Sequence, residues 1–249
     1  MVFLIQTGED DKMKPFVADV HMHSILSGHA FGTVRELAFE AAQRGMKLIG
    51  VTEHGPGIPG TCDPIYFRNI IDAPRVLYGV KMLYGSEVNV LNSGEVDLDR
   101  RHLDCLDYAV AGIHGLCYEN VGIVKNTDNV IRCMADPKVR FISHPDADTY
   151  PLDYKALVEG AREYNVALEV NNSSLRKPAL RPGRIGNYEK MLPLCMEQGV
   201  KIVVNTDAHD PSQVGDFVLA RAMLERLCFD ETLILNSDLE KLEAFLLNP

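Results

Sequence analysis

Short apolar segments of strand length recur along the chain, separated by polar clusters and by longer stretches with helical periodicity. Seven such segments, rich in Val, Ile, Leu or Tyr, lie at residues 16–20, 47–51, 81–84, 108–111, 140–142, 166–170 and 201–204. Their apolar residues run on without alternating with polar ones, which is typical of strands covered on both faces. The pattern therefore predicts seven buried strands of a parallel sheet.

Helical stretches with recognisable ends lie between these segments. Residues 33–36 form a capping-box pattern, and the helix that it opens stops at Gly45. A second capping box is expected at residues 237–240, with Ser237 as its first residue. Further helices are expected at residues 151–164, 187–198 (with a kink at Pro193) and 212–227. Strands that alternate with helices favour a β/α barrel or a doubly wound open sheet.

Chemically reactive side chains follow almost every predicted strand. In strand order they are His21 and His23, Glu53 and His54, Glu87, His114, His144, Asn171 and Asn172, and finally Asp207 and His209. In a β/α barrel the chemistry takes place on the loops that follow the carboxyl ends of the strands. Histidines placed at random would not gather at these positions, so the arrangement favours the barrel.

Two closely spaced pairs of ligand-type residues, His21 with His23 and Asp207 with His209, indicate metal binding. His21 and His23 are separated by one residue at a strand end, so both imidazoles point the same way and can reach one ion. Asp207 and His209 repeat this spacing near the other end of the chain and add a carboxylate. His29 follows in a loop that can return to the same mouth. Imidazole and carboxylate together suit zinc, manganese or iron.

The number of candidate ligands exceeds what one ion needs. There are nine: His21, His23, His29, His54, Glu87, His114, His144, Asp207 and His209. One metal ion takes about three or four protein ligands. If one carboxylate bridges, the nine side chains supply about three contacts to each of three ions. Such a cluster makes hydroxide available near neutral pH and neutralises a bound phosphate.

The motifs resemble those of the PHP (polymerase and histidinol phosphatase) family, most closely its small, single-domain bacterial members with three metal ions. They occur in order at residues 19–24, 29, 52–56, 85–89, 111–114, 142–145, 169–174 and 205–209. The resemblance extends over roughly residues 16–247. It implies an α/β fold, a distorted seven-stranded (β/α)7 TIM-like barrel with the metals at its C-terminal mouth.

The resemblance also implies how the ligands divide among three divalent ions, zinc foremost, with manganese or iron as alternatives. One ion is held by His21, His23, Glu87 and Asp207; a second by Glu87, His114 and His144; a third by His29, His54 and His209. One residue departs from the family pattern. Glu53 stands where the family usually has Asp, so the support of His54 is expected to differ.

The function implied is that of a metal-dependent phosphatase, histidinol-phosphatase-like, that hydrolyses small phosphate monoesters by a metal-bound hydroxide. Asp207 is a candidate proton relay as well as a ligand. Arg176 and Arg184, in the polar segment after the sixth strand, are candidates for phosphate binding because a guanidinium donates two parallel hydrogen bonds. Two alternatives remain: an amidohydrolase-type enzyme that cleaves C–N bonds, and a non-catalytic metal-binding regulatory module.

Three features are given more ordinary interpretations. His102 lies in a charged stretch and is expected to face solvent. Asn171 and Asn172 either line the pocket or cap a strand end by bonding to the backbone. The glycine- and proline-rich stretch 55–60 is expected to be a flexible loop beside the site, since it lacks the spacing of a phosphate-binding loop.

Composition narrows the classes of partner. The chain of 249 residues has 25 Lys and Arg against 35 Asp and Glu, a formal net charge of −10. This balance argues against nucleic acid or an anionic membrane as the main partner. Six cysteines without a CxxC pair predict free thiols and a cytoplasmic protein. We expect residues 1–14 to be an N-terminal extension without a signal peptide and residues 15–249 to be one domain; a homo-oligomer remains open.

Overall fold

The computed structural model describes residues 13–176 and 183–248 of the chain. Within them, one sheet contains the strands β1 (Ala18–Asp19), β2 (Leu48–His54), β3 (Val76–Leu77), β4 (Val80–Asn89), β5 (Tyr108–Gly112), β6 (Val139–Ile142), β7 (Ala167–Asn171) and β8 (Ile202–Asn205). All except β3 are parallel and neighbour one another in the order β1-β2-β4-β5-β6-β7-β8. The seven predicted strands are therefore confirmed.

The short strand β3 was not predicted. It pairs antiparallel with the start of β4, and the two strands are joined by Tyr78 and Gly79. Both joining residues have positive φ, 51° and 80°, as in the two-residue turns that suit the twist of a hairpin. A strand of two residues is too short to show any periodicity.

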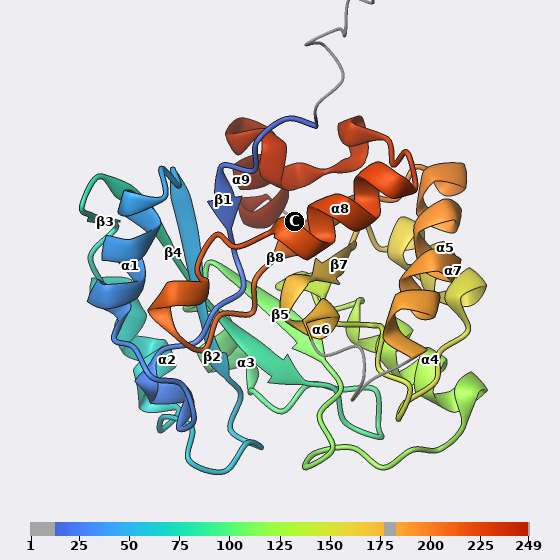
Figure 1. Cartoon of the computed structure of the whole chain (residues 1–249). Helices are drawn as coiled ribbons and strands as arrows, with labels where there is room; N and C mark the ends of the chain where they lie inside the picture. The colour runs from blue at the N-terminus through green and yellow to red at the C-terminus, as the bar shows by residue number, and fades with distance from the viewer. Residues whose placement is uncertain (1–12, 177–182, 249) are drawn as a thin grey trace, which may run out of the picture.

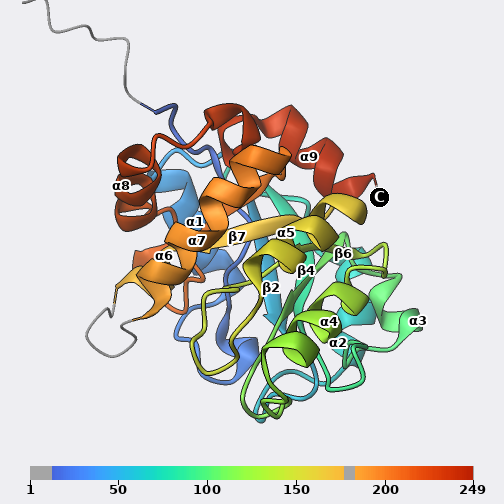
Figure 2. The ribbon, with the colours of Figure 1, turned by 90° about the vertical axis from the view of Figure 1, so that its right-hand side faces the viewer.

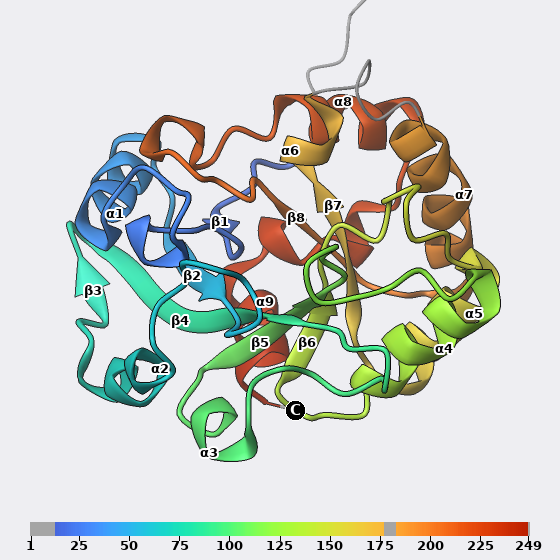
Figure 3. The ribbon, with the colours of Figure 1, turned by 90° about the horizontal axis from the view of Figure 1, so that it is seen from below.

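Helices surround the parallel strands, as Figures 1 and 3 show. In the described residues they are α1 (Val34–Gln43), α2 (Ile65–Asn69), α3 (Arg100–Leu103), α4 (Ile123–Cys133), α5 (Tyr154–Glu163), α6 (Asn172–Leu175), α7 (Gly183–Gln198), α8 (Val218–Arg226) and α9 (Leu239–Leu247). Figure 2 shows α5 and α7 side by side on the outside of the sheet. The result is the TIM-like α/β barrel predicted from the strand rhythm.

The segments that follow β1 and β8 bring the two ends of the sheet together. The backbone N–H of His23 donates to the carbonyl of Ala208 over 2.8 Å, and that of Asp207 donates to the carbonyl of His21 over 2.9 Å. Just before these two segments, at the end of β1, the buried Asp19 carboxylate accepts a hydrogen bond from the hydroxyl of Thr206 over 2.5 Å. The barrel is therefore nearly closed by the two segments that carry His21 with His23 and Asp207 with His209.

The interior of the barrel is apolar at the N-terminal ends of the strands. Alternate strand residues such as Leu48, Tyr108 and Phe141 form one buried cluster, and the helix α9 covers it with Leu242 and Phe245. The intervening strand residues pack against the outer helices in a second, larger cluster. A parallel strand buried on both faces explains the continuous apolar runs in the sequence.

Helix ends agree only in part with the sequence. Thr33 and Glu36 form the expected reciprocal capping box at α1. The box expected to begin at Ser237 is wrong, because the Asp238 carboxylate caps α9 by accepting from the N–H of Lys241. The helix expected at 212–227 is also shorter, since residues Pro211–Gln213 form a separate 3-10 turn before α8. Helix α7 begins earlier than expected and continues through Pro193.

The expectation that His102 faces solvent is wrong. The residue is 7% exposed and lies on the short helix α3, beside the buried Leu103. Its ring Nδ1 is 2.6 Å from Asp99 Oδ1, and Asp99 also caps the helix. The charged residues beside His102 in the sequence gave no sign that its side chain is buried and contacts Asp99, the residue that caps the helix.

Two further expectations concern the chain as a whole. All six cysteines lie in the described residues and are free thiols. Among those residues, no helix has both the length and the apolar character required to cross a bilayer. The division into an N-terminal extension and one domain stays a prediction, since residues 1–12 lie outside the described ranges.

Candidate metal centre

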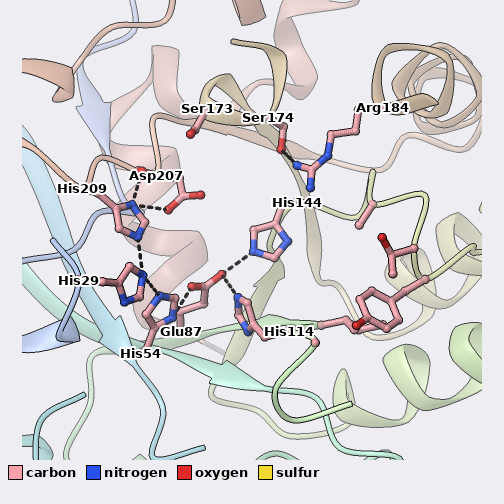
Figure 4. A pocket seen from close by; sticks show the side chains of 15 residues that line it. His29, His54, Glu87, His114, His144, Ser173, Ser174, Arg184, Asp207 and His209 are labelled. Carbon is pink, nitrogen blue, oxygen red and sulfur yellow. Dashed lines mark hydrogen bonds and ion pairs between the residues drawn. The ribbon is translucent and has the colours of Figure 1, made fainter. Parts of the chain in front are cut away.

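The inward-facing positions of the strands become polar towards the C-terminal mouth of the barrel. Glu87 lies four residues after the apolar Leu83 on β4 and therefore on the same face of the strand. Glu169 follows Ala167 on β7 with the spacing of two that keeps it on the inner face. The nine candidate ligands gather at this mouth, and Figure 4 shows seven of them around a common pocket.

The carboxylate of Glu87 lies at the centre of the cluster and is 1% exposed. Its ring neighbours are His144 Nε2 at 2.9 Å, His54 Nδ1 at 2.9 Å, His21 Nε2 at 3.3 Å, His23 Nε2 at 3.4 Å and His114 Nε2 at 3.5 Å. Burial opposes its ionisation, yet the charges of His21 and His114 hold the pKa of Glu87 well below its usual range. Glu87 is thus an anion that faces several ligand nitrogens at once.

Asp207 faces the first histidine pair. Its Oδ1 lies 3.3 Å from His23 Nε2 and 3.7 Å from His21 Nε2. Burial raises its pKa, but these two histidines more than offset that effect and leave the pKa below its usual range. Asp207 and His144 also have positive φ, 51° and 30°. Non-glycine residues adopt this conformation uncommonly, so the fold holds both side chains at a conformational cost.

Three imidazoles converge at the outer part of the cluster. His29 Nε2 lies 3.3 Å from His54 Nε2 and 3.1 Å from His209 Nε2. A neutral imidazole carries one N–H, so His29 cannot donate to both neighbours. On its other side, His54 has a buried Nδ1 that forms no well-aligned hydrogen bond. Burial and the charge of His23 lower the pKa of His54 to about 3, so a shared metal cation fits this donor set better than a proton.

Hydrogen bonds behind the rings prepare four histidines for metal binding through Nε2. The Nδ1 partners are Glu169 Oε1 for His21 (2.7 Å), Ser27 Oγ for His23 (2.9 Å), Asn89 Oδ1 for His114 (2.7 Å) and the Asp207 carbonyl for His209 (3.0 Å). A carboxylate or carbonyl can only accept, so His21, His114 and His209 carry a proton on Nδ1, and in the neutral imidazole that a metal ion requires the Nε2 lone pair is free. Metal-binding histidines generally have such a partner.

The grouping of the ligand atoms does not reproduce the expected division among three ions. Within the described residues, His21, His23 and Asp207 form one close group, as expected for the first ion. The other two groups are His54 with Glu87 and His114, and His23 with His54 and His209. Each of these two groups contains residues that the family resemblance assigns to different ions. The site and its division among ions therefore stay a prediction.

Comparison with known proteins identifies the family of the chain. The model of the PHP domain matches residues 19–169, more than half of the chain. A probable phosphatase of Clostridium acetobutylicum is 36% identical over 232 residues, which cover 93% of this chain and 94% of that protein. The chain belongs to the PHP family. A probable phosphatase of Thermoanaerobacter pseudethanolicus is similarly close, at 38% identity over 92% of this PHP protein and 94% of its own length.

A solved structure supports the fold of this PHP protein. Histidinol phosphate phosphatase from Lactococcus lactis, determined with zinc, L-histidinol and phosphate, superimposes with a TM-score of 0.60. The alignment covers 86% of this chain and 95% of that one, at 17% sequence identity. At this identity the likeness shows a common fold.

Glu53, the departure from the family pattern, does not support the ring of His54. Its carboxylate accepts hydrogen bonds from the hydroxyls of Ser24 and Ser27, both at 2.5 Å. Because Ser27 donates its single hydroxyl proton to Glu53, it accepts from His23 Nδ1. Glu53 therefore acts on the orientation of His23 and on the loop between the first two strands.

Glu169 is a functional residue to which the sequence assigned no role. Its Oε1 accepts from His21 Nδ1 at 2.7 Å and Asn205 Nδ2 at 2.9 Å. Its Oε2 accepts from the backbone N–H of His144 at 2.8 Å and Asn171 Nδ2 at 3.0 Å. A lone carboxylate within an apolar strand was the signal, since buried charges need partners.

Of the two roles expected for Asn171 and Asn172, the structure shows bonding to the backbone, and neither residue lines the pocket. Asn171 Oδ1 caps α6 through the N–H of Ser174, while its Nδ2 donates to Asp207 Oδ2 over 3.1 Å. Asn172 Oδ1 accepts from two N–H groups at the start of α8, those of Leu219 and Ala220. Asn171 thus contacts a candidate ligand, and Asn172 stabilises a helix end.

A pocket of about 290 Å³ opens beside the cluster, of the size that small ligands occupy. Arg184 lines it opposite the candidate ligands, with Nη1 2.6 Å from Ser174 Oγ and 3.3 Å from Asp146 Oδ2 (Figure 4). Burial raises the pKa of Asp146, and Arg184 opposes this effect. Among the described residues, Arg176 is not part of the lining; it pairs with Asp216 over 2.6 Å.

Proposed function

We propose that this PHP protein is a metal-dependent phosphatase that hydrolyses small phosphate monoesters. The supporting observation is the pocket that has seven of the nine candidate imidazole and carboxylate ligands on one side and the guanidinium of Arg184 on the other. The relatives named above are probable phosphatases, and the histidinol phosphate phosphatase from Lactococcus lactis binds zinc and phosphate. Metal and guanidinium together suit the oxygens of a phosphate group.

The proposed cofactor is a cluster of three divalent ions, zinc foremost, with manganese or iron as alternatives. The ligands are the nine side chains of the cluster, divided as the family resemblance implies. Glu87 is the proposed bridge, because both of its oxygens face ligand nitrogens of different histidines. When bound, the ions supply Lewis-acid activation of water and neutralise phosphate charge.

The protein's own groups orient the substrate and move protons. Arg184 donates to phosphate oxygens, and its contacts with Asp146 and Ser174 fix the guanidinium in place before substrate arrives. Asp207 is ionised, since neighbouring histidines hold its pKa low, and its side chain is 17% exposed at the pocket. Its place at the pocket makes it the proposed proton relay, and the low pKa favours donation of a proton to the leaving oxygen over uptake of one from water.

A substrate panel tests the class of reaction. Metal-loaded protein should release phosphate from small monoesters and show much slower turnover of phosphodiesters and acyl amides. Faster cleavage of the amides would favour the amidohydrolase alternative. A protein that binds metal ions stoichiometrically but turns over no substrate would favour the non-catalytic regulatory module.

Replacement of Arg184 by Ala should lower kcat/KM for a phosphate monoester by about a hundredfold, as for loss of one aligned donor in an active site. R184K should recover only part of this loss, because an ammonium lacks the planar fork. Steady-state kinetics on metal-loaded protein measure both. R176A is the matched variant. An equal loss of kcat/KM in R176A would indicate that Arg176 also contacts the substrate. Wild-type kinetics for R184A would show that Arg184 does not contact it.

A further inference from the structure

Asp97 is outside the ligand set, but its carboxylate contacts two segments that carry ligands. It lies at the end of the hairpin that follows β4, where Val90 and Val96 form an antiparallel bridge. Its Oδ1 accepts from the backbone N–H of Asn89 over 2.8 Å. Its Oδ2 accepts from Asn89 Nδ2 over 2.6 Å and from the N–H of Gly57 over 2.7 Å. Three donors surround it, so Asp97 acts as an acceptor only.

These contacts determine which way the Asn89 amide points. Asn89 is fully buried, and its NH2 group must face the acceptor Asp97. Its Oδ1 therefore faces His114, whose Nδ1 lies 2.7 Å away. An amide oxygen can only accept, so His114 has its proton on Nδ1 and a free lone pair on Nε2. That nitrogen is the one directed at Glu87, 3.5 Å away.

The loop after His54 is held by the same carboxylate. A Cβ atom at Gly55 or Gly57 would collide with the carboxylate oxygens of Asp97. Neither glycine has the positive φ that would require glycine for conformational reasons. Gly55 and Gly57, in the stretch expected to be a flexible loop, thus leave room for Asp97, and Gly57 also leaves room for the Cys117 sulfur.

We propose that Asp97 is a positioning residue for the metal centre: through Asn89 it fixes the tautomer of His114, and through Gly57 it holds the loop that follows His54. The proposal rests on the proposed metal centre. It assigns Asp97 no contact with substrate.

The variant D97A tests the relay. It removes the acceptor at which Asn89 Nδ2 and the Gly57 N–H now point. The Asn89 amide is then free to turn over and offer its NH2 to His114, which moves the histidine proton to Nε2. Loss of a hydrogen-bond partner behind a metal-binding histidine weakens metal binding by about 10- to 100-fold, and D97A should show a weakening of that size for one metal ion.

The double variant N89D/D97N should restore the relay. The carboxylate introduced at position 89 would accept from both His114 Nδ1 and the amide introduced at position 97, so the His114 proton returns to Nδ1. The Gly57 N–H would remain without its acceptor. We therefore expect the double variant to regain at least about tenfold of the lost affinity. A purely structural role for Asp97 predicts no such rescue, because the double variant carries two changes in a buried network.

Equilibrium dialysis with zinc, followed by elemental analysis, measures the affinity and number of ions per chain. D99N is the matched control, since it removes the same charge on the same segment, keeps a helix cap and contacts His102 rather than a ligand. It should bind zinc as the wild type does. Wild-type zinc binding by D97A, or a double variant no better than D97A, would overturn the proposal.

Metal-free wild-type protein gives a second measurement that requires no variant to fold. Imidazole ¹⁵N–¹H correlation spectra should show His114 protonated on Nδ1, and the Nε2 tautomer would contradict the relay. Failure of the proposal for Asp97 can be distinguished from failure of the proposed function. Wild-type protein that binds zinc but hydrolyses no phosphate ester would refute the phosphatase and leave the role of Asp97 intact.

Discussion

Replacing Glu87 with Gln should remove at least one metal ion per chain and lower the rate of phosphate release by about a thousandfold or more, since metal activation contributes several kcal/mol to such a reaction. The substitution preserves shape but removes the anion that five imidazoles surround. Its new NH2 group would face a ligand nitrogen in either orientation. Elemental analysis and a phosphate-release assay measure the two losses.

A control variant separates this effect from a general change of charge. E95Q removes one negative charge from an exposed residue on the hairpin after the same strand. It should match the wild type in metal content and rate. A Glu87→Gln protein with full metal content and wild-type turnover would show that Glu87 does not bridge ions.

Replacing Glu169 with Gln should destabilise the metal-free chain by about 3–5 kcal/mol, the range found when one partner of a buried ionic cluster is removed. Four donors point at the two oxygens of Glu169. Gln offers one oxygen, so two of those donors lose their acceptor whichever way the amide turns. Urea unfolding measures the change in free energy.

The same variant should weaken metal binding, because the His21 Nδ1–H contact with Glu169 keeps Nε2 free. E163Q, an exposed position on α5, is the matched control and should leave both stability and metal content unchanged. An E169Q chain as stable as the wild type would contradict the view that the four hydrogen bonds support the site.

Much of the fold could be predicted because burial on both faces of the strands leaves a direct trace in the sequence. The run at residues 166–170, for example, corresponds to β7. The hairpin strand β3 left no such trace, since it has two residues and its turn at Tyr78 depends on backbone geometry. At α9, Ser237 and Asp238 are both good caps, and only the path of the chain selects Asp238.

The candidate ligands could be found from sequence because parallel strands bring their carboxyl ends to one edge. His23 and Asp207 are far apart in the chain, yet barrel closure brings His23 Nε2 within 3.3 Å of Asp207 Oδ1. The supporting residues could not be found in this way. Asp97 and Glu169 act through hydrogen bonds whose partners are set by side-chain packing, and spacing in the sequence does not reveal such contacts.

The most direct test of the account is a zinc titration of metal-free protein, with phosphate release from a small monoester measured at each addition. We expect no turnover without metal and a rise that levels off at three equivalents of zinc per chain. Manganese and iron titrations, read in the same way, identify the ion that supports the fastest turnover. Full turnover in the metal-free chain, or saturation below two equivalents, would contradict the proposed metal centre.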